Sequence, residues 1–308
     1  MLHLNKPVHP YRESRHLLLS FENSKNDIIA SPSPLITNPP IPNVGMYDRV
    51  RAVGSCNGLV CISVSYNHCG TKDDLLFLLW NPAIGQSRFL PKPKCSTVSP
   101  SVIFEFGYVP ETNDYVIVKL DKEERLRFEV YKSSLDSWRV IDSAVVENHI
   151  TLKRDESSVF VNGCFHWRSL NYARDRIISY ELVSEKVGLI KALDNGVAGS
   201  ECWKLTVVED SLAMLFYNYI MFELWIMVDY NVHDSWDLRF RIVDDGNRLL
   251  YPLGCLRNGL IMITYEEDYV GVYLHDLITE QKTEISKVPH GWRINGFSSY
   301  SETLLPLC

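Results

Sequence analysis

The chain has 308 residues, of which 46% are hydrophobic, so it is long enough to bury a sizeable core. Its net charge of −7 argues against nucleic acid as a partner, because nucleic-acid-binding domains usually present a basic face. Eight cysteines without a C-x-x-C pair favour free thiols in a reducing compartment. With no signal-peptide pattern and no long apolar run, we expect a cytoplasmic or nuclear protein, or both, with no membrane partner.

A turn followed by a strong β-strand pattern recurs five times along the chain. Each copy opens on Asn or Asp and continues into β-branched or large apolar residues. The opening residues are Asn57, Asn113, Asn162, Asp210 and Asn258, and the gaps between them are 56, 49, 48 and 48 residues. A period in the forties indicates a repeat architecture.

A second pattern follows each of these turns and predicts a β-hairpin. Both arms are rich in β-branched and aromatic residues, and Asn, Asp, Ser or Gly stands at the bend. The five predicted hairpins cover 75–91, 128–141, 177–190, 223–242 and 270–285. No window holds an apolar 3.6-residue spacing over three turns between good caps, so we expect an all-β fold. Units of about 48 residues with four short strands are typical of the blades of a kelch-like β-propeller.

Five units lie between residues 50 and 290, and the two ends of the chain are left over. The N-terminal remainder includes a predicted strand, 15–21, and the segment 47–56, while the C-terminal remainder is 294–307. These ends can share a sheet, which would leave no unpaired sheet edge in the ring. We therefore predict about six blades, closed by pairing of N- and C-terminal strands, with five as the alternative.

Two apolar features have a structural interpretation. The most apolar stretch, 212–228, is interrupted by Asn218 and Glu223 and predicts two adjoining buried strands rather than a membrane span. Six tryptophans are predicted to pack between neighbouring blades instead of forming a binding platform. They are Trp80, Trp138, Trp167, Trp225, Trp236 and Trp292.

The sequence offers little catalytic or metal-binding chemistry. Cys61, His68 and Cys69 lie close together but lack a second ligand pair with zinc-site spacing. His166 stands in an apolar strand and is predicted to be a satisfied or half-buried side chain. Cys56 precedes an Asn-Gly turn and is a candidate reactive thiol, although no histidine is placed beside it. With no nucleophile elbow and no phosphate-binding loop, we assign no catalytic residue, no metal ligand and no cofactor.

The succession of short motifs closely resembles the F-box-associated domain of plant F-box proteins, over roughly residues 15–305. Each motif alone is weak, but the series at matching spacing is specific. The motifs are Cys56-Asn57-Gly58-Leu59, Trp80-Asn81-Pro82, Leu90-Pro91, Phe106-Gly107-Tyr108, Asp114-Tyr115, Val130-Tyr131, Ser137-Trp138, Asn162-Gly163 and His166-Trp167.

The resemblance implies a protein-binding role in an SCF-type E3 ubiquitin ligase. In this family an N-terminal F-box binds the Skp1 adaptor of a cullin ligase, and the associated β domain captures the protein to be ubiquitinated. The chain is then not an enzyme, because other subunits carry the ubiquitin chemistry. Its partner would be a protein substrate of unknown identity, with Skp1 and cullin as partners only where an F-box lies upstream.

The sequence departs from the family pattern because the helical F-box is missing. We expect residues 1–14 to be a remnant or linker that follows an absent F-box, and residues 15–308 to form the single associated domain. The chain would then be a truncated F-box protein. The alternatives are a free-standing propeller that competes with full-length relatives, and a propeller enzyme with a site in its central channel.

The protein-binding residues themselves are unknown from the sequence. Recognition usually lies on loops held by a rigid scaffold, so the long connections are the best candidates. They are 31–47, 92–102, 142–158 and 191–204.

Overall fold

In a computed structural model, the described part of the chain is built mainly of antiparallel strands. It describes residues 2–6, 13–17, 19–24, 27–32, 40–41, 49–66, 74–94, 102–121, 127–141, 151–152, 158–170, 176–194, 203–218, 221–243, 250–255, 260–266, 270–276, 279, 281–288, 293–297 and 304. In these residues the one helical element is a 3-10 turn, η2 (His233–Ser235). The chain divides into two compact units, residues 1–148 with 291–308 and residues 149–290. Each unit is described by itself.

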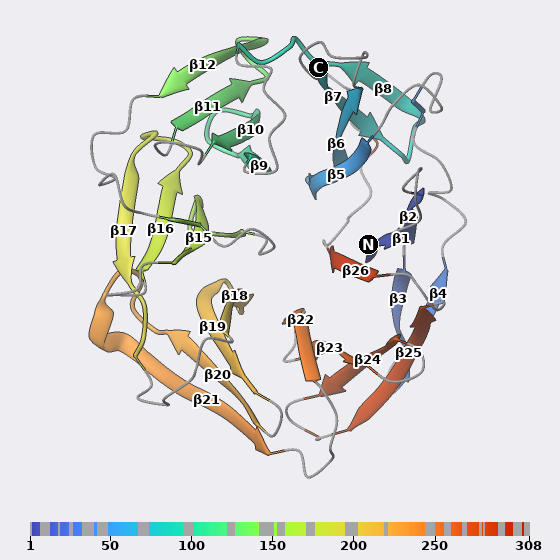
Figure 1. The fold of residues 1–308 in the computed structure, drawn as a ribbon, viewed down its shortest axis with the longest axis vertical. Helices are drawn as coiled ribbons and strands as arrows, with labels where there is room; N and C mark the ends of the chain where they lie inside the picture. The colour runs from blue at the N-terminus through green and yellow to red at the C-terminus, as the bar shows by residue number, and fades with distance from the viewer. Residues whose placement is uncertain are drawn as a thin grey trace. The chain divides into compact units, whose positions relative to one another are not determined.

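The first unit contains two four-stranded sheets whose strands follow one another in chain order (Figure 1). One sheet is built from β5 (Arg49–Cys56), β6 (Leu59–Tyr66), β7 (Asp74–Asn81) and β8 (Gln86–Phe89). The other is built from β9 (Val102–Val109), β10 (Asp114–Asp121), β11 (Arg127–Lys132) and β12 (Ser137–Ile141). The segment 49–56, taken from sequence as part of the N-terminal remainder, is therefore the first strand of a complete sheet.

The two ends of the chain pair with each other in this unit. Strand β1 (Leu2–Lys6) lies between β2 (Glu13–Leu17) and β26 (Arg293–Phe297), antiparallel to both. This confirms the predicted pairing of N- and C-terminal strands. The predicted strand 15–21 is divided between β2 and β3 (Leu19–Ser24), and β3 forms a separate hairpin with β4 (Asp27–Pro32).

The second unit contains three sheets. The first comprises β13 (Thr151–Leu152), β14 (Val159–Val161), β15 (Cys164–Leu170), β16 (Arg176–Glu181) and β17 (Val187–Lys191). The second comprises β18 (Trp203–Val208), β19 (Ser211–Tyr217), β20 (Met221–Met227) and β21 (Trp236–Val243). The third comprises β22 (Leu250–Cys255), β23 (Leu260–Glu266), β24 (Val270–Asp276) and β25 (Lys282–Val288). The pair β19–β20 confirms two adjoining strands in 212–228.

The all-β prediction is confirmed, and the blade count needs a correction. Across the described residues five sheets have four strands or more, whereas about six blades were predicted. The chain ends supply a three-stranded sheet and a two-stranded hairpin instead of a sixth four-stranded sheet. The reason is that β5, counted from sequence with the N-terminal remainder, pairs with β6 and completes the first repeat.

The recurring turn residues have backbone conformations that explain their recurrence. Asn57 and Gly58 have φ values of 45° and 79°, and Asn162 and Gly163 have values of 52° and 71°. Asn113 and Asp210 also have positive φ, whereas Asn258 lies outside the described residues. A left-handed pair between two strands matches the strand twist, and Asn and Gly adopt it at the lowest steric cost. The repeat is thus a repeat of the turn that joins the first two strands of a sheet.

Strand β6 packs against apolar side chains on both of its faces. Leu59 and Cys61 lie in a cluster with Phe106 and Ile117 of the neighbouring sheet. Val60, Ile62 and Val64 lie in a second cluster on the opposite face, with Ile41, Leu78 and Trp80. Because both faces are covered, a strand with few polar residues is stable here. Cys61 is fully buried there and acts as a small apolar side chain.

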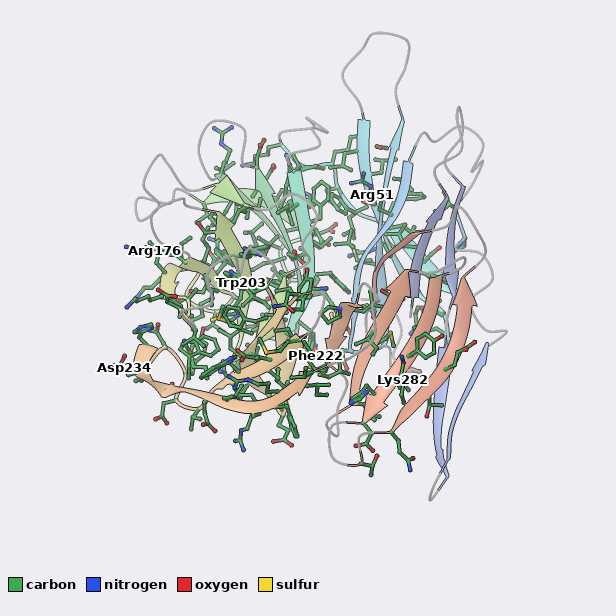
Figure 2. All side chains as sticks on the ribbon, turned by 60° about the horizontal axis from the view of Figure 1, so that its bottom comes forward. Arg51, Arg176, Trp203, Phe222, Asp234 and Lys282 are labelled. Atoms are coloured by element: carbon green, nitrogen blue, oxygen red, sulfur yellow. The ribbon has the colours of Figure 1, made fainter. Side chains whose placement is uncertain are left out.

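Burial is confirmed for the predicted tryptophans that can be described, and packing between two sheets is seen for Trp138, Trp225 and Trp236. Trp80, Trp138 and Trp167 are buried, Trp225 and Trp236 are partly buried against a core cluster, and Trp292 lies outside the described residues. Trp203, which the sequence had not singled out, is among the largest fully buried side chains. Figure 2 shows it among the closely spaced side chains of the second unit.

Candidate recognition surface

Each four-stranded sheet has two chemically different ends. Because neighbouring strands are antiparallel, the turn between strands one and two lies at the same end as the turn between strands three and four. We call this the turn end. The opposite end, where strands two and three are joined and where the chain leaves for the next sheet, is called the loop end.

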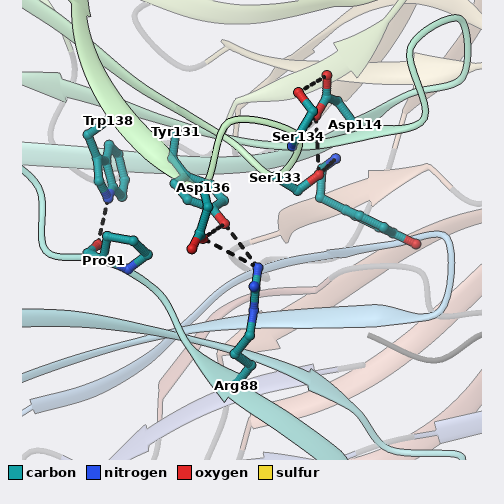
Figure 3. A network of polar contacts seen from close by, with 9 residues as sticks. Arg88, Pro91, Asp114, Tyr131, Ser133, Ser134, Asp136 and Trp138 are labelled. Atoms are coloured by element: carbon teal, nitrogen blue, oxygen red, sulfur yellow. Dashed lines mark hydrogen bonds and ion pairs between the residues drawn. The ribbon is translucent and has the colours of Figure 1, made fainter. Parts of the chain in front are cut away.

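The turn end of the sheet β9–β12 is short and internally hydrogen-bonded. In the sheet β9–β12, the carboxylate of Asp114 accepts hydrogen bonds from Ser134 N at 2.7 Å, Ser134 Oγ at 3.0 Å and Ser133 Oγ at 3.2 Å (Figure 3). Burial favours a higher pKa for Asp114, but these hydrogen bonds outweigh it and hold the pKa below its usual value. The carboxylate therefore holds the two turns of this sheet end together.

Three of the predicted connections, 92–102, 142–158 and 191–204, begin where the last strand of a sheet finishes, and the fourth, 31–47, begins within β4 of the two-stranded hairpin β3–β4. The structure adjusts their boundaries, since Val102 already opens β9, Trp203 opens β18, and β13 lies within 142–158. Most of their other residues lie outside the described part of the chain. Their described portions include both exposed residues, such as Lys92 and Asp194, and buried ones, with Ile41 in one core cluster and Ala192 in another.

The start of the 92–102 connection is attached to the next sheet. Trp138 Nε1 donates a 2.7 Å hydrogen bond to the carbonyl of Pro91, and the Lys94 amide donates to the Glu129 carboxylate. Glu129 also forms an ion pair with Lys119 at 3.3 Å, and the two side chains are only 2% and 1% exposed. A buried charge must be paired to be tolerated, so this pair fixes the point at which the connection leaves the scaffold.

A second link joins the outer strand β8 of the first sheet to β11 and its following turn in the second sheet. Arg88 Nη2 lies 3.2 Å from Tyr131 Oη and 3.5 Å from Asp136 Oδ1, and Tyr131 Oη donates to Asp136 Oδ1 at 2.8 Å (Figure 3). Burial and the bond to Asp136 raise the pKa of Tyr131, so the phenol stays protonated and can donate. Such links favour a rigid frame beneath the loops.

In the second unit, His166 is fully buried and its Nε2 lies 2.8 Å from Tyr230 Oη. Burial lowers the pKa of His166 to about 4. Burial also raises the pKa of Cys164, which hydrogen-bonds the same hydroxyl. A neutral histidine beside a protonated thiol is not the ion pair of an activated cysteine nucleophile. The hydrogen bond between His166 and Tyr230 instead joins strand β15 to the loop after β20.

Other buried polar groups in this unit are paired in the same way. Glu223, which is 3% exposed, accepts from Arg241 Nη2 and Nε, each at 2.7 Å, and from Trp225 Nε1 at 2.9 Å. The Arg168 guanidinium lies 4.2 Å from the centre of the Trp203 ring. The Glu223 contacts lie within the predicted hairpin 223–242, whereas Arg168 and Trp203 come from different sheets.

The candidate reactive thiol is not activated. Burial raises the pKa of Cys56 well above its ordinary value, and it raises the pKa of Cys255 to about 12. Among the described residues no three His, Cys, Asp or Glu side chains are grouped closely enough to hold a metal ion, and His68 and Cys69 lie outside that part. The same residues contain no helix with the length and hydropathy of a membrane span.

The fold, the repeated turns and the motif order define the class of protein as an all-β repeat protein of the propeller type. Residues 11–288 match the model of the F-box associated beta propeller domain, and the chain belongs to that family. The resemblance seen in the motifs is therefore confirmed.

Named relatives agree with this assignment. An F-box/kelch-repeat protein of Arabidopsis thaliana is 25% identical over 61% of this chain and 52% of its own length. A putative F-box/kelch-repeat protein and an F-box protein of the same plant are each 27% identical, over 72% and 62% of this chain and 58% and 50% of their own lengths. The chain spans about half the length of these relatives.

A solved structure from a study of two prolyl endopeptidases is similar in fold. It matches 92% of this chain and 40% of its own chain, with a TM-score of 0.50 and 8% sequence identity. At that identity the likeness describes the path of the backbone alone.

Proposed function

We propose that this chain is the substrate-recognition part of an F-box protein, and that it captures a protein for ubiquitination by an SCF-type ligase. The family match over residues 11–288 carries the proposal, because the relatives that share it are F-box proteins. The proposal takes residues 15–308 as one protein-binding domain that works in the cytoplasm, the nucleus or both.

The structure supports a binding role because a predicted recognition loop starts from a fixed point on the sheets. Links such as Trp138–Pro91 and Lys119–Glu129 attach the start of one connection to the scaffold. Loops that start from fixed points lose less conformational entropy on binding than freely moving ones. The predicted connections 31–47, 92–102, 142–158 and 191–204 are therefore still the proposed contact segments.

A non-enzymatic role is part of the proposal. The described cysteines have raised pKa values, and the buried His166 is neutral at physiological pH, so neither group is prepared for nucleophilic catalysis. The competing candidate function is that of an enzyme. The fold likeness to an endopeptidase chain does not support it, because at 8% identity the likeness describes the backbone alone.

Capture from plant tissue tests the proposal. The full 308-residue chain is expressed with a tag, with and without proteasome inhibition, and captured proteins are identified by quantitative mass spectrometry. We expect a small set of proteins whose recovery rises under inhibition and which carry ubiquitin. Capture of Skp1 and a cullin in the same sample would place the complex in an SCF ligase. Recovery of the same proteins by an unrelated propeller of similar charge would refute the proposal.

A further inference from the structure

The loop that joins β20 to β21 differs from the other described turns between third and fourth strands. It runs from Val228 to Ser235, whereas the corresponding turns after β7 and β11 contain only 82–85 and 133–136. We call it the 228–235 loop. Figure 2 labels Asp234 within it, at the tip of the hairpin.

The loop is held by its own hydrogen bonds. Ser235 Oγ accepts from the amide of Asp229 at 3.1 Å and lies 2.7 Å from the carbonyl of Val232. The amide of Val228 donates to the carbonyl of Ser235 at 3.0 Å, and the amide of Val232 donates to that of Asp229 at 3.0 Å. Tyr230 attaches the middle of the loop to His166 of the neighbouring sheet. The conformation is therefore set before any partner arrives.

This fixed loop presents apolar side chains to solvent. Val228 is 56% exposed, Val232 is 50% exposed and Tyr230 is 37% exposed. Single exposed apolar residues are ordinary on protein surfaces, but three within five residues of an ordered loop form a local apolar surface. Tyr230 also has the large, amphipathic ring that is enriched at protein interfaces.

Both carboxylates of the loop are exposed. The side chain of Asp234 is 97% exposed and lies 3.9 Å from His233 Nε2, and Asp229 is also exposed. Arg239, the next Lys or Arg along the chain, forms an ion pair with Asp237 at 3.6 Å. The whole chain has a net charge of −7. A partner that covers the valines would bring its own charges close to these carboxylates, and complementary charges favour association while like charges oppose it.

We propose that the 228–235 loop is a docking surface for a protein segment in which apolar side chains alternate with lysine or arginine. The apolar side chains cover Val228, Tyr230 and Val232, and the basic groups lie against Asp229 and Asp234. The inference rests on the proposed function, since it names one contact surface of the same protein-binding domain. It also places that surface at the turn end of the sheet β18–β21, outside the four connections predicted from the sequence.

Synthetic peptides of defined composition test the docking surface. Fluorescently labelled Lys/Leu, Lys/Ser and Glu/Leu peptides of equal length are titrated with the full chain, and binding is followed by anisotropy. We expect the Lys/Leu peptide to bind most tightly. V228S/V232S should weaken its binding by about tenfold or more through lost apolar contact, and D229N/D234N should weaken it through lost charge complementarity.

Matched variants control for the loss of any two valines or any two charges. V140S/V243S removes two exposed valines from outer strands, and E111Q/E284Q removes two exposed carboxylates from other sheets. Both should leave affinity within about twofold. The docking proposal would be overturned if the control variants lost as much affinity as the loop variants. It would also be overturned if V228S/V232S lost none, or if the Glu/Leu peptide bound as tightly as the Lys/Leu peptide.

The rival interpretation is that the 228–235 loop binds a second copy of this chain. Sedimentation velocity of the wild type should show no self-association that V228S/V232S abolishes; a loop-dependent dimer would overturn the proposal and assign the loop to self-association. Because the probes are synthetic peptides, either failure leaves the result of the capture experiment unchanged.

Discussion

Trp138 and Pro91 are joined by a 2.7 Å hydrogen bond from the indole N–H to the backbone carbonyl, between the outer strand of one sheet and the segment that leaves the neighbouring sheet. The Trp138 ring also packs in the core cluster that contains Phe77 and Tyr131. One side chain thus fills the space between two sheets and fixes the start of a candidate recognition loop.

Replacing Trp138 should separate these two contributions. Trp138→Phe keeps most of the packing but leaves the Pro91 carbonyl unpaired, and we expect a loss of about 1–2 kcal/mol in the free energy of unfolding. Trp138→Ala should cost about 3–5 kcal/mol because it also opens a cavity. Urea denaturation measures both. Val140→Ser, two residues along the same strand and exposed, is the control, and an equal loss there would contradict the account.

The buried pair Lys119–Glu129 predicts strong non-additivity. Lys119→Met leaves the Glu129 charge buried beside an apolar side chain, and we expect a loss of about 3–5 kcal/mol. The double variant K119M/E129L should cost clearly less than the sum of the single variants, although it also removes the acceptor for the Lys94 amide. A double-mutant cycle by urea denaturation makes the comparison. Additive losses would show that the two charges do not depend on each other.

Gly163 isolates the cost of a left-handed backbone. Its φ is 71°, and an added Cβ would meet no atom within 4 Å, so steric contact with the rest of the protein contributes nothing. Gly163→Ala should therefore lose about 1 kcal/mol of stability from backbone strain alone. Asn162→Gly is the partner control, because glycine accepts the neighbouring φ of 52° without strain. Thermal unfolding of the two variants should differ in this order.

His166 predicts a pH dependence of stability. Its pKa is about 4 in the folded protein against about 6.5 when unfolded, so between these values the unfolded chain binds the extra proton. The contribution of the neutral histidine is complete above about pH 6.5 and falls as the pH drops toward about 4, by up to about 3 kcal/mol.

The variant H166Q tests this contribution. It has no titrating ring and retains a polar group near Tyr230, so its stability should fall less than that of the wild type between about pH 7 and about pH 5. Urea midpoints at both pH values supply the difference, and all other titrating groups are shared. Identical pH slopes for the two proteins would mean that His166 is protonated equally in both states.

The described thiols should resist alkylation. Burial raises the pKa values of Cys56, Cys61, Cys164 and Cys255, so little thiolate forms in the folded protein. Iodoacetamide labelling followed by peptide mass spectrometry should modify these four residues only after denaturant is added. Rapid native labelling of Cys56 would restore it as a candidate reactive thiol.

Local sequence signals located most strands and their turns. Asn57-Gly58 and Asn162-Gly163 revealed the repeat because a left-handed pair restricts which residues fit, and that restriction is visible in a single sequence. The same reasoning misplaced β5, because Arg49–Cys56 carries no special turn at its start and resembles a continuation of the N-terminal segment.

The contacts that surround the candidate surface were not predictable in the same way. Trp203 fell inside the predicted connection 191–204, whereas it is the first residue of β18. Its burial depends on a core cluster formed by distant strands. The pairs Lys119–Glu129 and His166–Tyr230 join residues whose proximity is fixed only by tertiary packing. The long connections were visible as candidates, whereas the 228–235 loop was hidden inside a predicted hairpin.

The central claim is that this chain binds a protein substrate, and direct binding between purified proteins tests it. The protein most enriched in the capture experiment is purified and titrated against the full chain by calorimetry, with an unrelated propeller of similar charge as the control. The account predicts saturable one-to-one binding to this chain and none to the control. Absence of binding by the most enriched proteins, or equal binding by both propellers, would contradict it.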